Sequence, residues 1–234
     1  MSLALVTGAS RGLGNALATA LAARGWSLVV DGRDAAALAD AADALRAAGA
    51  RGVHAVTGDV ADPRHRARLV AAAADAGGAD LLVNNASTLG PSPQPRLADY
   101  PPAELERVYA VNTLAPLALI QGLLPQLEHA GGRIVNVTSD AAVEPYAGWG
   151  GYGSAKAALE QLTAILAAET PHLRVYAFDP GDMRTRMHQE AFPAEDISDR
   201  PEPQSVVPAL LRLVEEDLPS GRFRAADLAQ AVPA

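Results

Sequence analysis

A tyrosine and a lysine one helical turn apart are the residues of this sequence whose types and spacing best suit acid–base chemistry. They are Tyr152 and Lys156, within the stretch GWGGYGSAK. If a helix begins near Tyr152, the phenol and the ammonium lie side by side on one of its faces. The ordinary pKa of a phenol, about 10, suits neutral pH poorly, and a neighbouring ammonium would lower that pKa by stabilising the phenolate. For such a pair standing alone, the alternative is a surface contact that follows a flexible loop.

A glycine-rich turn near the amino terminus could hold a phosphate group. It is the stretch TGASRGLG, which lies between a predicted strand and a predicted helix. Gly8, Gly12 and Gly14 would let the backbone turn tightly and approach a pyrophosphate, and the free N–H groups of the helix would attract its charge. The spacing differs from the common G-x-G-x-x-G, but the place in a βαβ unit predicts a dinucleotide site.

The type of dinucleotide depends on residues about twenty positions further on. Asp31 and Asp34 both stand near the distance at which an acid binds the ribose 2′-hydroxyl of NAD. Gly32 best fits the tip of the strand, however, with Arg33 directly after it, and Arg11 lies inside the glycine turn. Two guanidinium groups beside the ribose favour the 2′-phosphate of NADP. The sequence therefore predicts NADP(H) as the preferred cofactor, with NAD(H) and a merely solvated Arg33 as the alternatives.

The composition argues against several classes of protein. Of the 234 residues, 49% are hydrophobic, which is enough for a substantial core. There are 27 acidic and 19 basic side chains, and the net charge of −8 argues against a nucleic-acid partner, because such binding needs clustered Lys and Arg. There are no cysteines, so disulfides, thiolate catalysis and cysteine zinc sites are excluded, and we predict no metal site.

No stretch predicts a membrane partner. The amino-terminal LALVTGAS has no basic region or cleavage-like site, so we expect no secretory signal. NTLAPLALIQGLLPQL is the most apolar later stretch, but Pro116 and Pro125 interrupt it, and we expect it to be too short and too broken for a membrane span. We therefore expect a cytoplasmic protein.

Short apolar runs alternate with longer stretches rich in alanine and leucine. The runs are continuous, as is typical of strands covered on both faces. The predicted strands are Leu3–Thr7, Ser27–Val30, Val53–Thr57, Leu81–Asn84, Arg133–Val137 and Arg174–Phe178. The predicted helices are Gly12–Arg24, Ala35–Ala48, Pro63–Ala76, Pro102–Gln126 and Tyr152–Ala168. This alternation predicts an α/β fold: one Rossmann-type domain over residues 1–234, with a doubly wound parallel sheet and helices on both faces.

Two segments depart from this alternation. Ser87–Pro102 is too rich in proline for a helix or a central strand, so we expect an ordered surface loop. The segment 187–204 is polar, irregular and bounded by prolines. We interpret it as a flap on the substrate side, with a plain connector as the alternative.

A series of short motifs along nearly the whole chain resembles that of the classical short-chain dehydrogenase/reductase family. The turn TGASRGLG resembles its glycine motif, Asp59–Val60 the pair that contacts the adenine ring, and NNAS its N-N-A-G. VYAVN ends at the position of its active-site asparagine, here Asn112, and RIVNVTS leads to its catalytic serine, here Ser139. YGSAK is similar to its Y-x-x-x-K, and DPGDMRT to its P-G-x-x-x-T.

The resemblance implies an enzyme that transfers a hydride between a nicotinamide and a carbonyl or alcohol carbon. Tyr152 would be its acid/base, and Lys156 would tune Tyr152 and bind the nicotinamide ribose. Ser139 would align the substrate oxygen, and Asn112 would anchor a water that links Lys156 to solvent. Thr185 would hold the nicotinamide carboxamide. The residues expected at the cofactor are Gly8, Ser10, Arg11, Gly12, Leu13, Gly14, Arg33, Asp59, Val60, Asn85, Ala86, Tyr152, Lys156, Pro180, Gly181, Met183 and Thr185.

Two residues depart from the family pattern. Ser87 replaces the last glycine of N-N-A-G, which we expect to alter the backbone beside the cofactor. Asp140 directly follows Ser139 and would bring a carboxylate towards the pocket, unless it points to solvent or caps a turn.

Residues before and after the tyrosine motif suggest a substrate pocket. Together with Asp140, the residues Tyr146, Trp149 and Met187 could line a pocket that accepts apolar or aromatic groups. The Gly-Trp before the tyrosine motif and the Thr-x-Met at Thr185 also resemble, faintly, the sepiapterin reductase and benzil reductase branch. That branch reduces ketones or adjacent dicarbonyls, so the implied partner is a small-molecule carbonyl or alcohol.

Some alternatives stay open at this point. The helices Pro102–Gln126 and Tyr152–Ala168 carry apolar residues on more than one face, which predicts a homodimer or homotetramer or, failing that, cover by the chain's own loops. A non-catalytic NADP(H)-binding regulator would need only the glycine turn and the two arginines. A sugar-nucleotide epimerase fits poorly, because the chain has no sizeable carboxy-terminal substrate domain.

Overall fold

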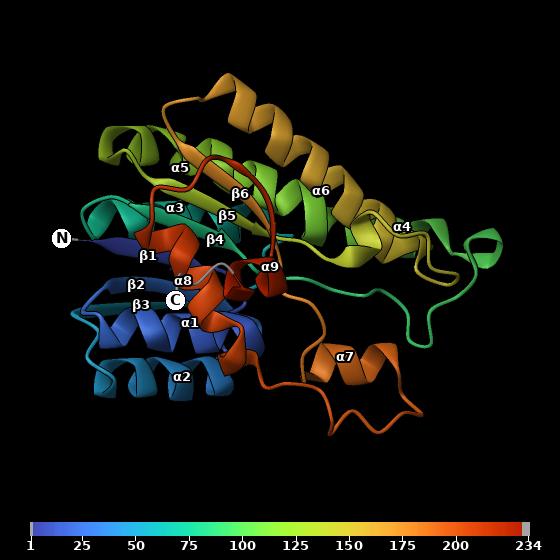
Figure 1. Ribbon diagram of the computed structural model, residues 1–234. Coiled ribbons are helices and arrows are strands. Elements are labelled where there is room, and N and C mark those ends of the chain that lie inside the picture. Colours follow the sequence, from blue (N-terminus) through green and yellow to red (C-terminus); the bar gives the residue numbers. More distant parts are fainter. Residues whose placement is uncertain (1, 231–234) are drawn as a thin grey trace.

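The chain folds around one seven-stranded parallel sheet with helices on both faces (Figure 1). The computed structural model describes residues 2–230. The strand order is β3-β2-β1-β4-β5-β6-β7. The strands are β1 (Leu3–Val6), β2 (Ser27–Gly32), β3 (Gly52–Thr57), β4 (Leu81–Asn84), β5 (Arg133–Val137), β6 (Arg174–Asp179) and β7 (Gly221–Arg224). The helices are α1 (Gly12–Ala23), α2 (Ala35–Ala47), α3 (Pro63–Asp75), α4 (Pro102–Tyr109), α5 (Ala115–Ala130), α6 (Gly150–Glu169), α7 (Arg186–Ala191), α8 (Val207–Glu215) and α9 (Ala225–Gln230).

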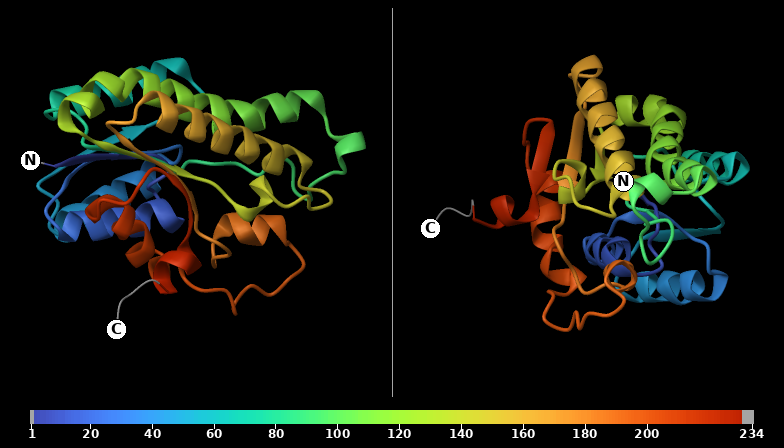
Figure 2. Two further views of the ribbon diagram at one scale, coloured as in Figure 1. Left: turned by 45° about the horizontal axis from the view of Figure 1, so that its top comes forward. Right: turned by 90° about the vertical axis from the view of Figure 1, so that its right-hand side faces the viewer.

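The continuous apolar runs form central strands because both faces of the sheet are covered. Along β1, Ala4 and Val6 join the core on the side of α1, α2 and α8, while Leu3 and Leu5 join the core against α3 and α5. Successive side chains of a strand point to opposite faces, so a strand with two covered faces needs apolar residues at every position. The two layers of helices are visible above and below the sheet in Figures 1 and 2.

The predicted doubly wound fold is confirmed, and most element boundaries agree within two residues. The strand β7 was missed, because Gly-Arg-Phe-Arg is short and carries two charged side chains. The segment Ser87–Pro102 is irregular apart from one short 3₁₀ turn at Leu97–Asp99, as expected of a loop.

The helix predicted over Pro102–Gln126 is confirmed and extends to Ala130, but the prolines do not break the apolar stretch around Pro116 as expected. Pro102–Ala130 forms 29 consecutive helical residues, because a π-helical turn at Ala110–Leu114 joins α4 to α5. Pro116 lies in the first turn of α5, where a missing N–H is tolerated, and Pro125 lies inside that helix. By length and composition this helix could cross a membrane, but half of its most apolar window is buried against the rest of the chain. A helix in the core of a globular protein can be equally long and apolar.

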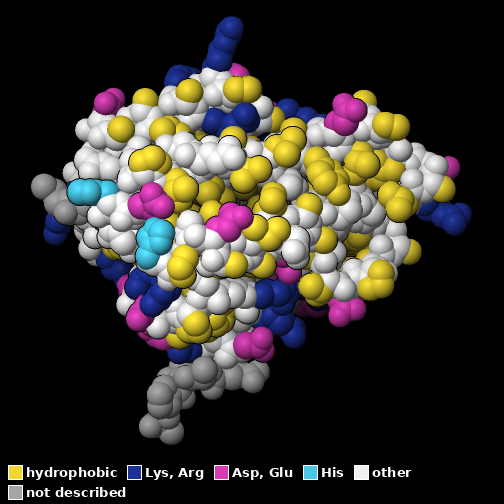
Figure 3. Space-filling model, turned by 90° about the horizontal axis from the view of Figure 1, so that it is seen from above, with side chains coloured by type: hydrophobic (Ala, Val, Ile, Leu, Met, Phe, Trp, Pro, Cys, Tyr) yellow, Lys and Arg dark blue, Asp and Glu magenta, His cyan; other side chains and the backbone are white. Residues whose placement is uncertain are grey.

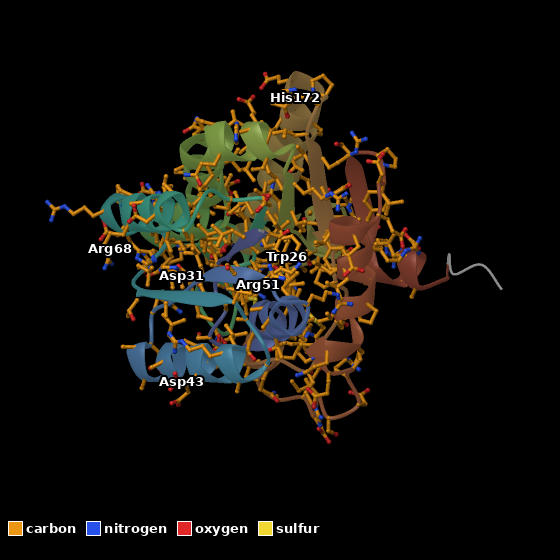
Figure 4. The ribbon with its side chains drawn as sticks, turned by 90° about the vertical axis from the view of Figure 1, so that its left-hand side faces the viewer. Trp26, Asp31, Asp43, Arg51, Arg68 and His172 are labelled. Atoms are coloured by element: carbon orange, nitrogen blue, oxygen red, sulfur yellow. The ribbon has the colours of Figure 1, made fainter. Side chains whose placement is uncertain are left out.

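The strand order places a cleft at one edge of the sheet. The chain winds outwards from β1 to β3 on one side and from β4 to β7 on the other, so the direction reverses between β1 and β4. Loops after the carboxyl ends of strands diverge at such a point and leave a crevice, where ligands bind in folds of this kind. Figure 4 views the molecule from the opposite side, where the amide of Arg51 donates to the carbonyl of Trp26 at 3.2 Å.

Candidate active site

A cleft of about 870 Å³ opens at the carboxyl edge of the sheet and brings together residues from most of the predicted motifs. Sixteen of the residues expected at the cofactor line it, as do Ser139, Asp140, Trp149 and Met187. Three of the predicted site residues do not line the cleft, namely Gly14, Asn112 and Tyr146. Gly14 and Asn112 lie behind the residues that line the cleft and contact them.

The phenol of Tyr152 and the ammonium of Lys156 lie next to each other on α6, as the four-residue spacing predicts. The helix begins at Gly150, so both side chains belong to its first two turns. Tyr152 is 7% exposed and Lys156 is 2% exposed. Lys156 Nζ lies 5.6 Å from the centre of the Tyr152 ring and donates a hydrogen bond to the carbonyl of Val137 at 2.7 Å.

The expected lowering of the Tyr152 pKa is not found in the structure. Burial raises the pKa of Tyr152 to about 12, and hydrogen bonds with Ser139 and Ser87 only partly offset that effect. Burial likewise lowers the pKa of Lys156 to about 8, although Glu160 acts in the opposite direction. The cost of burying a phenolate, to which the carboxylates of Asp179 and Asp140 add, therefore outweighs any attraction to the lysine. Tyr152 is protonated at neutral pH and suited to donate a proton.

The hydroxyl of Ser139 is oriented by the residue that follows it. Ser139 Oγ donates to Asp140 Oδ1 at 2.9 Å and accepts from the amide of Ala141 at 3.2 Å. The other carboxylate oxygen of Asp140 accepts from the phenol of Tyr146 at 3.0 Å. Asp140 thus both caps a turn and lines the cleft, whereas Tyr146 is 46% exposed and reaches the site only through Asp140 and the ring of Trp149.

Asn112 lies in the π-helical turn and is fully buried. Pro116 has no N–H, so the carbonyl of Asn112 lacks the donor that an α-helix would supply there. The side chain of Asn112 holds the segment after β4: it donates to the carbonyl of Thr88 at 2.8 Å and accepts from the Thr88 amide at 2.9 Å and from Ser87 Oγ at 3.1 Å. π-Helical turns often occur at functional sites, and this one fixes the wall beside Tyr152.

The glycine turn is held from below by the side chains of a buried aspartate and a partly buried asparagine. The amide of Gly8 donates to Asp31 Oδ1 at 2.6 Å, and His65 Nε2 lies 2.9 Å from Asp31 Oδ2. Asn85 Nδ2 donates to the carbonyls of Thr7 at 2.8 Å and Gly8 at 3.2 Å. A Cβ atom on Gly14 would lie 2.6 Å from the carbonyl oxygen of Gly8, so the turn requires glycine there. His65 had no recognisable signal in the sequence.

One end of the cleft carries two arginines, Arg11 and Arg33, and no acid fully occupies either. Asp34 caps α2 through two backbone amides at 3.1 Å, and its other oxygen lies 3.9 Å from Arg11 NH2. Arg33 is exposed, and its charge contributes to the low pKa of Asp59. Burial acts to raise that pKa, but the amide of Ala61 and the Arg107 guanidinium outweigh it.

Residues from both ends of the segment 187–204 line the cleft. The segment contains most of the short helix α7, which Thr185 caps by accepting the amide of His188 at 3.1 Å. Met187 and Ala191 pack against Leu89 and Tyr152. The ring of Phe192 lies 5.8 Å from that of Trp149, so this end of the cleft is apolar and aromatic.

An ion network joins the last two strands of the sheet to the backbone of Ser139. Arg222 of β7 donates to Glu160 and to Asp179 at 2.9 Å each and to the carbonyl of Ser139 at 3.4 Å. Glu160 also accepts from Thr138 Oγ1 at 2.7 Å. The side chain of Asp179 is only 3% exposed, and Arg222 is its ion-pair partner. No local pattern of residues indicates this network, because its members are far apart along the chain.

We expect Arg222→Leu to lower the free energy of unfolding by about 1–3 kcal/mol, because Asp179 would keep a buried charge without its partner. Urea unfolding would measure this as a lower midpoint at an unchanged slope. Arg174→Leu is the matched control, since it breaks an ion pair with the exposed Asp217 and should change the midpoint far less. Equal effects of the two substitutions would contradict the importance of the network.

Within residues 2–230, no group of His, Asp and Glu side chains is arranged to hold a metal ion. The hydrogen-bond donors that line the cleft include hydroxyls, arginines, side-chain amides and one lysine. This donor set suits a phosphate-containing organic cofactor, and the glycine turn leaves room for its backbone to approach.

Comparisons with known proteins agree with the fold and with the motifs. A family model described as short chain dehydrogenase matches residues 2–196. The chain is 37% identical over 202 residues to a sepiapterin reductase from Meriones unguiculatus, which covers 81% of this chain and 77% of that protein. A short chain dehydrogenase structure from Pseudomonas syringae is 32% identical, has a TM-score of 0.90 and covers 96% of this chain and 94% of the other. A structure from Escherichia coli, solved with NADPH, is 29% identical, has a TM-score of 0.89 and covers 96% of each chain.

These matches extend over most of the chain and include the tyrosine motif and the glycine turn. The resemblance to the sepiapterin reductase branch is supported by the 37% identity to one of its members. The family model covers most of the chain, and the sheet, the cleft and the tyrosine–lysine pair agree with it. The chain therefore belongs to the short chain dehydrogenase family of oxidoreductases.

Proposed function

We propose that this protein is an NADP(H)-dependent oxidoreductase that interconverts a ketone and a secondary alcohol, with Tyr152 as the acid/base. The observation that carries the proposal is the position of the Tyr152 phenol: it is buried in the cleft that the glycine turn also lines, beside Lys156 and Ser139. A protein that only bound the cofactor would not need a buried phenol with two hydroxyl partners at this place.

The proposed preference for NADP(H) rests on the contacts of Asp31 and Asp34, the two acids that could bind the ribose 2′-hydroxyl of NAD. Asp31 is 2% exposed and already holds the Gly8 amide and His65, so it is not available to a ribose hydroxyl. Asp34 caps α2. Arg33 and Arg11 offer exposed guanidinium groups at the same end of the cleft, which suits a 2′-phosphate. The family member from Escherichia coli was solved with NADPH.

When bound, the cofactor would supply or accept the hydride. The residues of this chain would manage the proton and the geometry. In the reductive direction, Tyr152 donates its proton to the oxygen of the former carbonyl, and in the oxidative direction the phenolate takes that proton back. Ser139 aligns the oxygen, and the nearby Lys156 ammonium favours the phenolate. The glycine turn, Thr185 and the backbone around Gly181 would hold the cofactor.

The substrate side of the cleft suggests a carbonyl next to an aromatic or apolar group. Trp149, Met187 and Phe192 supply the apolar walls, and the segment 187–204 would act as the flap that excludes water. The relative from Meriones unguiculatus is named a sepiapterin reductase, and we propose an aromatic ketone or an adjacent dicarbonyl as the substrate class.

Turnover of NADPH with a panel of aromatic ketones and adjacent dicarbonyls tests the proposal. At least one compound should be reduced, and NADPH should raise the melting temperature more than NADH does. A ligand at about 100 times its Kd adds about 2.7 kcal/mol of stability, so the two cofactors can be ranked directly. Tight NADPH binding without turnover across the panel would instead favour a non-catalytic regulator.

We further propose that the protein acts in the cytoplasm as a homodimer or homotetramer. Leu114 is 56% exposed and Ile165 is 43% exposed, on the face formed by α5 and α6. Figure 3 shows hydrophobic side chains spread over this upper side of the molecule. A second copy would cover such an apolar face, and sedimentation measures the resulting mass.

A further inference from the structure

The hydroxyl of Ser87 lies beside the acid–base tyrosine, at a position where the family motif has a glycine. Ser87 follows β4 and lines the cleft. Its Oγ donates to Asn112 Oδ1 at 3.1 Å, and like the hydroxyl of Ser139 it lies close enough to the phenol of Tyr152 to lower the pKa of that group. We expected this serine to alter only the backbone next to the cofactor, but its side chain joins two residues of the site.

The two hydroxyls beside the phenol differ in what holds their protons. Ser139 donates to the carboxylate of Asp140 at 2.9 Å, and a hydrogen bond to a charged acceptor is about twice as strong as one between neutral groups. Ser87 donates to the uncharged amide oxygen of Asn112. Turning the hydroxyl of Ser87 away from its acceptor therefore costs less. Ser87 is the hydroxyl that is free to follow a change in charge on Tyr152.

We propose that Ser87 is a further catalytic residue: when Tyr152 gives up its proton, the Ser87 hydroxyl turns from Asn112 to the phenolate and stabilises it. The inference rests on the proposed function. In reduction, the carbonyl carbon gains the hydride, the phenol O–H bond breaks and its proton bonds to the substrate oxygen. The O–H bond of Ser87 stays intact throughout, and only its hydrogen-bond acceptor changes.

The groups around Tyr152 disfavour its phenolate, so a further hydrogen-bond donor would help to stabilise it. Burial is the main cause that raises the pKa of the phenol, and the carboxylates of Asp179 and Asp140 add to it. Lys156 is the nearby cation, but its Nζ donates to the carbonyl of Val137 and burial lowers its own pKa to about 8. A second hydroxyl donor stabilises the phenolate without adding a buried charge.

The test compares Ser87→Ala with the wild type in both reaction directions across a range of pH. Without the Ser87 donor the apparent pKa of Tyr152 should rise by about one unit. Oxidation requires the phenolate, so its rate at a pH below the midpoint should fall up to about tenfold. Reduction requires the phenol, so its rate should persist to a pH about one unit higher than in the wild type. Ser87→Thr should restore the wild-type profiles.

Two further measurements separate this role from a structural one. The affinity for NADPH, measured by its fluorescence, should change less than about threefold in Ser87→Ala, which is a change as small as many unrelated substitutions cause. Ser154→Ala removes an exposed hydroxyl of α6 and should leave both profiles unchanged. Equal losses of rate in both directions at every pH, or no change of rate at all, would overturn the proposed role of Ser87 but leave the proposed function standing. Absence of turnover by the wild type would refute the proposed function and this inference with it.

Discussion

Replacing Tyr152 by phenylalanine is expected to lower kcat/KM for ketone reduction by about 100- to 10,000-fold, the usual contribution of a positioned general acid. The substitution removes one oxygen from a side chain that is 7% exposed, and the ring keeps its contacts with Trp149 and Leu89. The loss corresponds to about 3–5 kcal/mol of transition-state stabilisation. NADPH affinity should change little, because the phenol is only one of many groups that line the cofactor cleft. Steady-state rates and NADPH fluorescence measure the two quantities separately.

Tyr176→Phe is the matched control for this result. Tyr176 is fully buried in β6, and its hydroxyl donates to the carbonyl of Leu218 at 2.8 Å, outside the residues that line the cleft. Its loss should lower the free energy of unfolding by about 1 kcal/mol without a comparable loss of activity. Unchanged activity in Tyr152→Phe would refute the mechanism, whatever the effect on stability.

The fold could be predicted from the sequence, and the candidate catalytic groups could be proposed from it, because both depend on short-range patterns. Continuous apolar runs separated by longer alanine- and leucine-rich stretches predicted the parallel sheet. The four-residue spacing of Tyr152 and Lys156 placed them on one helix face. Pro116 and Pro125 did not break the long helix predicted over Pro102–Gln126, since a proline in a first turn and a π-helical turn both leave a helix continuous.

The parts that could not be predicted depend on contacts between distant residues. Ser87 and Asn112 are 25 positions apart, and Asp31 and His65 are 34 apart, so no local pattern reveals either pair. The direction of the Tyr152 pKa was also wrong, because the spacing of the lysine was visible and the burial of the phenol was not. Asp31 was noticed for its distance from the glycine turn, but its partners decide its role.

Arg33→Ala is expected to weaken NADPH binding by about 10- to 100-fold, since a hydrogen bond between charged groups contributes about 1.5–3 kcal/mol. Arg33 is exposed at the adenosine end of the cleft, so its guanidinium can reach a 2′-phosphate without displacing a buried partner. NADH lacks that phosphate, and its affinity should change less than about threefold. The ratio of the affinities for NADPH and NADH should therefore fall by nearly the same factor as the affinity for NADPH. Arg11→Ala should have a smaller effect, because Asp34 lies 3.9 Å from the Arg11 guanidinium and already engages part of its charge.

Arg51→Ala separates this specific contact from the general effect of one positive charge. Arg51 is also exposed, but it directly precedes β3, at the amino-terminal edge of the sheet and away from the cleft (Figure 4). Both substitutions change the net charge by the same amount, so a long-range effect would weaken NADPH binding in both. A loss confined to Arg33→Ala shows direct recognition of the phosphate. Equal dissociation constants of Arg33→Ala and the wild type for NADPH would contradict the assignment, and tighter binding of NADH than of NADPH by the wild type would make the protein an NAD(H) enzyme.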